Sequence, residues 1–204
     1  MSDLVEKLAR EVYRVAGRSD ARPTFPVDLA RRILGEDAVI VARQLSSEGY
    51  LVPIAGRWRI VVRQGLTRRR LAHVVGHELG HWICRVEGVP DDEERCDAIG
   101  AAIVAPAPAV ASVLARRPPR LRDLAWCFST SESLAALRYA EVTGEALALV
   151  TPERVRVRGQ CDWPPESKLR KLAQSGGGDG WRAVRLRDDP RRVALTPAFS
   201  GLVA

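Results

Sequence analysis

Hydrophobic residues along this chain follow a helical repeat in some stretches and an extended pattern in others. Apolar positions three and four residues apart predict amphipathic helices, and short runs rich in valine and isoleucine predict strands. The pattern therefore predicts an α+β fold. We expect helices at residues 3–17, 27–34, 71–86, 92–105, 121–127 and 131–142, and strands at 39–41, 50–54, 57–62, 146–150, 154–158 and 181–186.

Residues that break these patterns predict where the elements end. Residues 106–120 are rich in proline and arginine and are interpreted as a connector. Ser129 and Glu132 form a capping box, and Gly144 suits the C-cap of the helix that follows. The glycine-rich stretch 175–180 is expected to be a flexible loop.

The histidines suggest the chemistry. All three lie within residues 73–81, and two of them frame an H-E-x-x-H pattern. Residues four apart share one face of a helix, so His77 and His81 can bind one Zn²⁺ ion while Glu78 acts as general base on a metal-bound water. The opposite face of this helix is apolar. Gly76 and Gly80 lower its helix propensity, which suggests that another backbone approaches closely there.

A third ligand is predicted from the acidic run that follows. Catalytic zinc usually has three protein ligands and keeps one position for water. Glu93 and Asp97 are four apart and share a face, so one can bind the metal while the other orients a ligand histidine. Glu93 is our choice for the ligand. Glu94, which points about 100° away, is the alternative, and the run also suits a helix N-terminus.

Residues 66–81 and 93–106 resemble the core of the ImmA/IrrE family of metallopeptidases. In that family H-E-x-x-H is followed by a helix with the pattern Glu-x-x-Ala-Asn/Asp-x-Phe-Ala. This chain has Cys96, Ile99 and Gly100 in place of the Ala, the Phe and the second Ala. These are packing positions and leave the ligands unchanged.

The resemblance extends over about residues 4–144, or about two-thirds of the chain. It implies a gluzincin-like fold in which Glu93 completes the metal site and Asp97 supports a ligand histidine. It also implies a regulatory protease of narrow range, whose partners would be helix-turn-helix repressors. We accordingly expect a zincin-like metallopeptidase core at residues 1–120, a packing helix pair at 121–145, and a small β-rich appendage at 146–204.

Composition limits the remaining classes of function. The chain has 204 residues, of which 46% are hydrophobic, but it has no apolar run of about eighteen residues and its start is polar. Its four cysteines are irregularly spaced and contain no C-x-x-C pair. These features predict a cytoplasmic protein outside the membrane. The net charge of +7 is only a weak indication of nucleic-acid binding, because arginine-rich composition has other causes.

The leading hypothesis is a zinc-dependent endopeptidase. An extended peptide substrate could pair with the edge of a strand beside the metal helix. The tetrahedral oxyanion of such a reaction needs a further donor, for which Tyr139, Tyr50 and Arg138 are candidates. The helix pair at 121–142 resembles a helix-turn-helix, but its second helix has too few basic residues for reading a DNA groove.

The competing hypothesis is a non-catalytic, zinc-stabilised module that binds a transcriptional regulator or DNA. His73 and Cys84 also lie on the metal face of the helix, and either residue as a fourth ligand would close the site. A redox role for Cys84 or Cys96 is a second alternative. The simpler interpretation is that both cysteines are small, buried, apolar packing residues.

Overall fold

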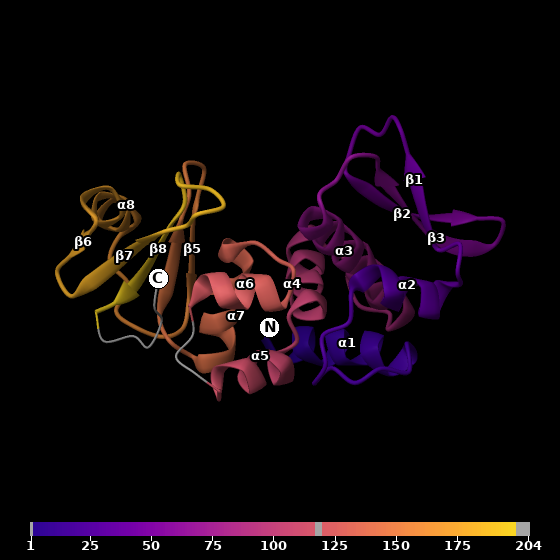
Figure 1. The fold of residues 1–204 in the computed structure, drawn as a ribbon, viewed down its shortest axis with the longest axis horizontal. Helices are drawn as coiled ribbons and strands as arrows, with labels where there is room; N and C mark the ends of the chain where they lie inside the picture. The colour runs from indigo at the N-terminus through magenta and orange to yellow at the C-terminus, as the bar shows by residue number, and fades with distance from the viewer. Residues whose placement is uncertain (1, 117–119, 199–204) are drawn as a thin grey trace. The chain divides into compact units, whose positions relative to one another are not determined.

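The computed structural model describes residues 2–116 and 120–198, and within them it has the mixed α+β fold that the pattern predicts, with eight helices and two small sheets (Figure 1). The chain divides into two compact units. The first unit comprises residues 1–109 with 128–130, and the second comprises 110–127 with 131–204. The assignment of separate roles to 1–120, 121–145 and 146–204 stays a prediction.

The first unit is built around two helices that pack side by side, α3 and α4 (Figure 1). Thr67 caps α3 by accepting a hydrogen bond from the Arg70 amide, and Asp92 caps α4 in the same way. Their apolar faces share one core with the two N-terminal helices. The helices of this unit are α1 (Ser2–Val15), α2 (Pro26–Leu34), α3 (Arg68–Val86) and α4 (Glu93–Val104).

Glycines bring the backbones of α3 and α4 into direct contact. A Cβ on Gly100 would lie 2.8 Å from the amide nitrogen of His77, and a Cβ on Gly80 would lie 2.9 Å from the carbonyl oxygen of Cys96. A Cβ on Gly76 would lie 3.0 Å from the carbonyl oxygen of Gly100. Side chains larger than hydrogen would therefore separate the helices. The close backbone approach expected from Gly76 and Gly80 is confirmed.

A three-stranded sheet packs against α3 in the same unit. Its order is β1 (Val39–Ala42), β3 (Arg57–Arg63), β2 (Gly49–Ile54), with β1 parallel and β2 antiparallel to β3. The amide of Arg63 donates to the carbonyl of Glu48, so the even-numbered residues of β2 bond to β3. Gly49 and Leu51 consequently direct their backbone groups to the free edge of β2.

The second unit contains a five-stranded antiparallel sheet with the order β5-β4-β8-β7-β6. Helix α8 covers one face through Leu169, Leu172 and Ala173, which pack against apolar residues of β4 and β8. Helix α7 packs on β4 and β5 and against α6. The elements after α4 are α5 (Ala107–Leu114), α6 (Leu121–Cys127), α7 (Glu132–Thr143), β4 (Leu147–Val150), β5 (Val155–Arg158), α8 (Glu166–Ser175), β6 (Gly177–Gly178), β7 (Trp181–Arg185) and β8 (Val193–Pro197).

Several local expectations are wrong. Residues 107–114 form helix α5 instead of connector, and helix α8 and strand β8 have no counterpart in the expected elements. The cap of α7 is Ser131, whose side chain accepts from the amide of Leu134, because Ser129 itself adopts a left-handed backbone with φ of +48°. Gly144 does end α7 in the left-handed conformation, as predicted.

Helix length and composition bear on membrane insertion. In the part of the chain that the structure describes, no single helix is long and apolar enough to cross a membrane. Helices α4 and α5 pass that test only as a pair, and they are bent by 48° relative to each other.

Candidate metal centre

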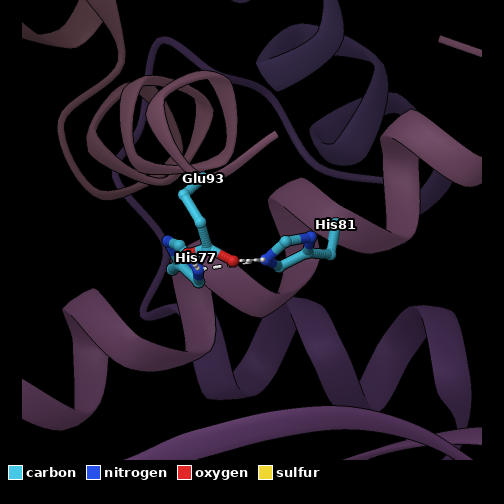
Figure 2. A group of neighbouring side chains, drawn as sticks. All are labelled: His77, His81 and Glu93. Carbon is cyan, nitrogen blue, oxygen red and sulfur yellow. Dashed lines mark hydrogen bonds and ion pairs between the residues drawn. The ribbon is translucent and has the colours of Figure 1, made fainter. Parts of the chain in front are cut away.

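His77 and His81 present their imidazoles on the face of α3 that meets the start of α4. Their Nε2 atoms lie 3.1 Å apart, and both side chains retain some solvent exposure, at 16% and 12%. Glu93, in the first turn of α4, extends its carboxylate between the two rings (Figure 2). One carboxylate oxygen is 3.3 Å from Nε2 of His77 and the other is 3.6 Å from Nε2 of His81. The three side chains therefore form one group of potential ligands.

The spacing of these donor atoms fits a tetrahedral metal ion. Zinc bonds of about 2.0–2.1 Å at tetrahedral angles place neighbouring donor atoms about 3.3–3.4 Å apart. The two Nε2 atoms are 3.1 Å apart and one oxygen of Glu93 is 3.3 Å from Nε2 of His77, close to that value, while the other oxygen is 3.6 Å from Nε2 of His81. With one ligand atom taken from each residue, all three atoms lie within 4.8 Å of one another. Two imidazoles and one carboxylate also leave one of four tetrahedral positions for solvent. The residues present thus fit a metal ion with an open position.

The hydrogen bonds behind the imidazoles direct their lone pairs toward this point. Nδ1 of His77 lies 2.9 Å from Oδ1 of Asp97. A carboxylate only accepts, so Nδ1 of His77 carries the proton and Nε2 of the neutral ring has the free lone pair. Burial lowers the pKa of His77, but the hydrogen bond and charge of Asp97, with the nearby glutamates, outweigh burial and raise the pKa overall.

His81 is oriented by a different pair of residues. Its Nδ1 is 3.3 Å from Sγ of Cys96 and 3.5 Å from Oδ2 of Asp91. Asp91 also accepts a hydrogen bond from Arg85. This bond is the main reason that the pKa of the Asp91 carboxyl lies below its usual range, and the hydrogen bond from His81 lowers the pKa less. A proton on Nδ1 of His81 satisfies these neighbours and leaves Nε2 as an acceptor. The Nε2 lone pairs of the two histidines and the carboxylate of Glu93 then face one another with no proton between them. A bound cation would stabilise this arrangement.

Glu78 lies beside the ligand group and is held from the sheet. The residue is 6% exposed, and its carboxylate accepts the backbone N–H of Leu51 at the free edge of β2. Burial raises the pKa of Glu78, and the charges of His77 and His81 offset part of that rise. A Cβ on Gly49 would lie 2.4 Å from Cγ1 of Val74 and 3.4 Å from Oε1 of Glu78, so β2 runs directly against this part of α3.

The structure does not place the alternative ligands in the group. Glu94 is exposed, and among the described residues it is not a member of the group formed by His77, His81 and Glu93. His73 lies one turn before His77, with its Nε2 4.0 Å from Oδ1 of Asp97. Burial, and then the charge of Arg70, lowers the pKa of His73. Cys84 is fully buried behind the histidines.

The two cysteines near the site hydrogen-bond to each other across α3 and α4. Both Cys84 and Cys96 are fully buried, and burial raises the pKa of each thiol. Because the thiolate is the form that reacts with oxidants, buried thiols with raised pKa values react slowly. Their environment is that of packing residues, and Cys96 also contacts His81.

Of the three candidate oxyanion donors, Tyr50 belongs to the same unit as the ligand group, and Arg138 and Tyr139 belong to the second unit. Tyr50 is 40% exposed on β2, and its hydroxyl lies 2.7 Å from that of Ser46. Arg138 and Tyr139 are buried on α7 in the second unit. Arg138 pairs with Glu141 at 2.8 Å, and burial raises the pKa of Tyr139 well above its ordinary value.

Sequence reasoning missed three contributors to the site. Asp91 was not assigned to the site, although it opens the acidic run, and Cys96 was considered for packing or a redox role but not as a neighbour of Nδ1 of His81. No sequence signal predicts the hydrogen bond from the Leu51 amide to Glu78, because any residue at an edge position offers a backbone N–H. Edge position follows only from the order of the sheet.

Comparison with known proteins supports the fold alone. No protein-family model matches the chain, and no curated protein matches it. Among solved structures, the chain is similar to a Mycobacterium tuberculosis transcriptional regulator, with a TM-score of 0.58 and 12% sequence identity. The alignment covers 78% of this chain and 57% of that one, so this chain spans little more than half of the regulator's length.

Proposed function

We propose that this protein is a zinc-dependent endopeptidase with a zincin-like core, related to the ImmA/IrrE metallopeptidases that residues 66–106 resemble. The observation that carries the proposal is the convergence of His77, His81 and Glu93, whose ligand atoms all lie within 4.8 Å of one another, next to the buried carboxylate of Glu78. Two histidines and a glutamate with one open position are typical of catalytic zinc in peptidases.

Each residue has a defined task in this proposal. His77, His81 and Glu93 hold the ion, which when bound polarises the scissile carbonyl and lowers the pKa of water. Glu78 takes a proton from the attacking water and returns it to the leaving amine. Asp97 and Asp91 keep the imidazoles of His77 and His81 oriented.

The free edge of β2 supplies a binding mode for substrate. An extended peptide can pair with backbone groups at this edge, through hydrogen bonds that depend little on side chains. The Leu51 amide already contacts Glu78, so a strand bound here would pass beside the general base. The substrate would be a protein segment that is extended or locally unfolded, and a helix-turn-helix repressor is the partner that the family resemblance suggests.

The test separates metal binding from catalysis. Purified protein supplied with zinc is analysed for metal content and incubated with repressors encoded beside its gene, and fragments are identified by mass spectrometry. We expect Glu78→Gln to retain zinc and lose cleavage, and His81→Ala to lose the metal. His73→Ala is the matched control, because His73 lies on the same face outside the ligand group. Unaltered cleavage by Glu78→Gln would refute the proposed mechanism, and a fully loaded protein without cleavage would favour a non-catalytic zinc module.

A further inference from the structure

The positive charge of this protein is concentrated in its second half. Residues 110–204 contain sixteen Lys and Arg against ten Asp and Glu, a net charge of +6 out of the +7 of the whole chain. The metal centre lies in the other, nearly neutral unit. The basic character therefore belongs to a part of the protein to which the proposed peptidase chemistry gives no role.

Four of these arginines surround a single cavity within the second unit. The cavity has a volume of about 140 Å³, and apolar residues of α6 and β7, Leu121 and Val184, form part of its wall. One water molecule needs about 10–15 Å³ of such space, so the cavity is large enough to admit phosphate groups. The charged residues that line it are Arg120, Arg122, Arg185, Arg187 and Glu132.

The guanidinium groups at this cavity are available to a ligand. All four arginines are exposed, and none forms an ion pair with a carboxylate within residues 2–116 and 120–198. Arg185 makes one long contact, 3.5 Å, to the carbonyl of Pro190. The single acidic residue, Glu132, uses one carboxylate oxygen to accept the Arg187 amide at 2.7 Å. The cavity therefore has a surplus of positive charge.

Helix α6, which contributes Arg122 to the cavity, also carries an exposed aromatic side chain. Trp126 is 76% exposed on α6, whose inner face buries Leu121, Leu124 and Ala125. Residues four apart share a helix face, so Trp126 stands one turn from Arg122 on the exposed side. A nucleotide base can stack on an exposed aromatic ring of this kind.

The geometry points to a nucleotide-binding site in the second unit, with the phosphate groups of a nucleoside di- or triphosphate in the arginine-lined cavity and the base stacked on Trp126. Arginine suits this task because its planar fork donates two parallel hydrogen bonds to a phosphate. Four arginines around one small space favour a compact polyphosphate over an extended nucleic-acid backbone, whose phosphates are spread along the strand.

Calorimetric titration of the full chain with ATP and with inorganic pyrophosphate tests this site. We expect both to bind saturably, and Arg122→Gln and Arg187→Gln each to weaken both about tenfold. The matched control is Arg154→Gln, an exposed arginine of the same unit outside the cavity, which removes the same charge and should leave affinity within about twofold. Trp126→Leu should weaken ATP about tenfold and leave pyrophosphate unchanged, and Trp126→Phe should retain most of the affinity for ATP.

Three results would overturn the assignment. The first is no saturable binding of either probe by the wild-type chain, and the second is equal weakening by Arg122→Gln and Arg154→Gln, which would reveal non-specific charge attraction. The third is tighter binding of a single-stranded oligothymidylate than of ATP, lost in the same variants, because the phosphates would then belong to a nucleic acid. Zinc content and peptidase activity play no part in these measurements.

Discussion

Replacing Gly100 by Ala directly tests how the candidate metal centre is held together. The added Cβ would lie 2.8 Å from the amide nitrogen and 2.9 Å from the Cα of His77, and 3.0 Å from the carbonyl carbon of Gly76. All of these are backbone atoms of α3, which no change of rotamer can move aside. The two helices must therefore separate, and Glu93 and Asp97 move with α4.

The size of the effect follows from these distances. Ordinary van der Waals contact begins at 3.4 Å, so α4 must recede by roughly 0.6 Å, whereas ligand distances in metal sites vary by only about 0.2 Å. Overpacking costs about 1–3 kcal/mol, and the better helix propensity of Ala returns about 1 kcal/mol. We expect a loss of about 0–2 kcal/mol in the stability of the metal-free protein, and zinc affinity weakened at least about tenfold by displacement of one of three ligands.

The assay is competition for zinc with a chelator of known affinity, together with urea unfolding of the metal-free protein. Ala101→Ser on the same helix serves as the control, because Ala101 is only partly buried and is not among the nearest neighbours of the three glycines. A zinc dissociation constant for Gly100→Ala within about twofold of wild type would refute the argument that backbone contact sets the ligand positions.

Two further predictions concern hydrogen bonds elsewhere in the first unit. Asp97→Asn replaces the acceptor at Nδ1 of His77 with an amide, which should weaken zinc binding about 10–100-fold without removing a ligand; unchanged affinity would contradict the orienting role. Tyr13→Phe removes a buried hydroxyl that donates to the carbonyl of Ile103 at 2.9 Å and accepts from the Thr24 amide, and should cost about 1–3 kcal/mol of unfolding free energy in urea. Burial raises the pKa of Tyr13 from 10.0 to about 12. The stability that the neutral hydroxyl contributes is therefore complete below pH 10 and is lost as pH rises toward 12. The difference in unfolding free energy between wild type and Tyr13→Phe should shrink over that window, and a constant difference would contradict this linkage.

The residues of the candidate metal centre could be predicted from sequence because their arrangement is largely local. Two histidines four residues apart on a helix share a face whatever the rest of the fold does. The preference for Glu93 over Glu94 rests on the same periodicity, and the structure brings Glu93, with Asp97 one turn later, to the histidines. The glycines of α3 also indicated close packing, since nothing in an isolated helix favours them.

The second unit was harder to predict. The apolar face of helix α8 consists only of Leu169, Leu172 and Ala173. These three residues stabilise the helix only by packing against the sheet, which the sequence pattern of the helix does not reveal. Strand β8 is central in that sheet, paired on both sides, yet its five residues carry no alternating pattern because both faces are buried. The order of the strands, which joins β4 to β8, follows from tertiary packing.

The sequence by itself determined that this chain has an α+β fold and that His77, Glu78 and His81 occupy adjacent positions on one helix. Only the tertiary structure decided that α4 packs close enough for Glu93 to reach both imidazoles, that Asp91 and Cys96 lie behind His81, and that a strand edge contacts Glu78. The reason is physical. Helical periodicity fixes which residues share a face, whereas the distance between two helices depends on every side chain between them, and here on the absence of side chains at three glycines.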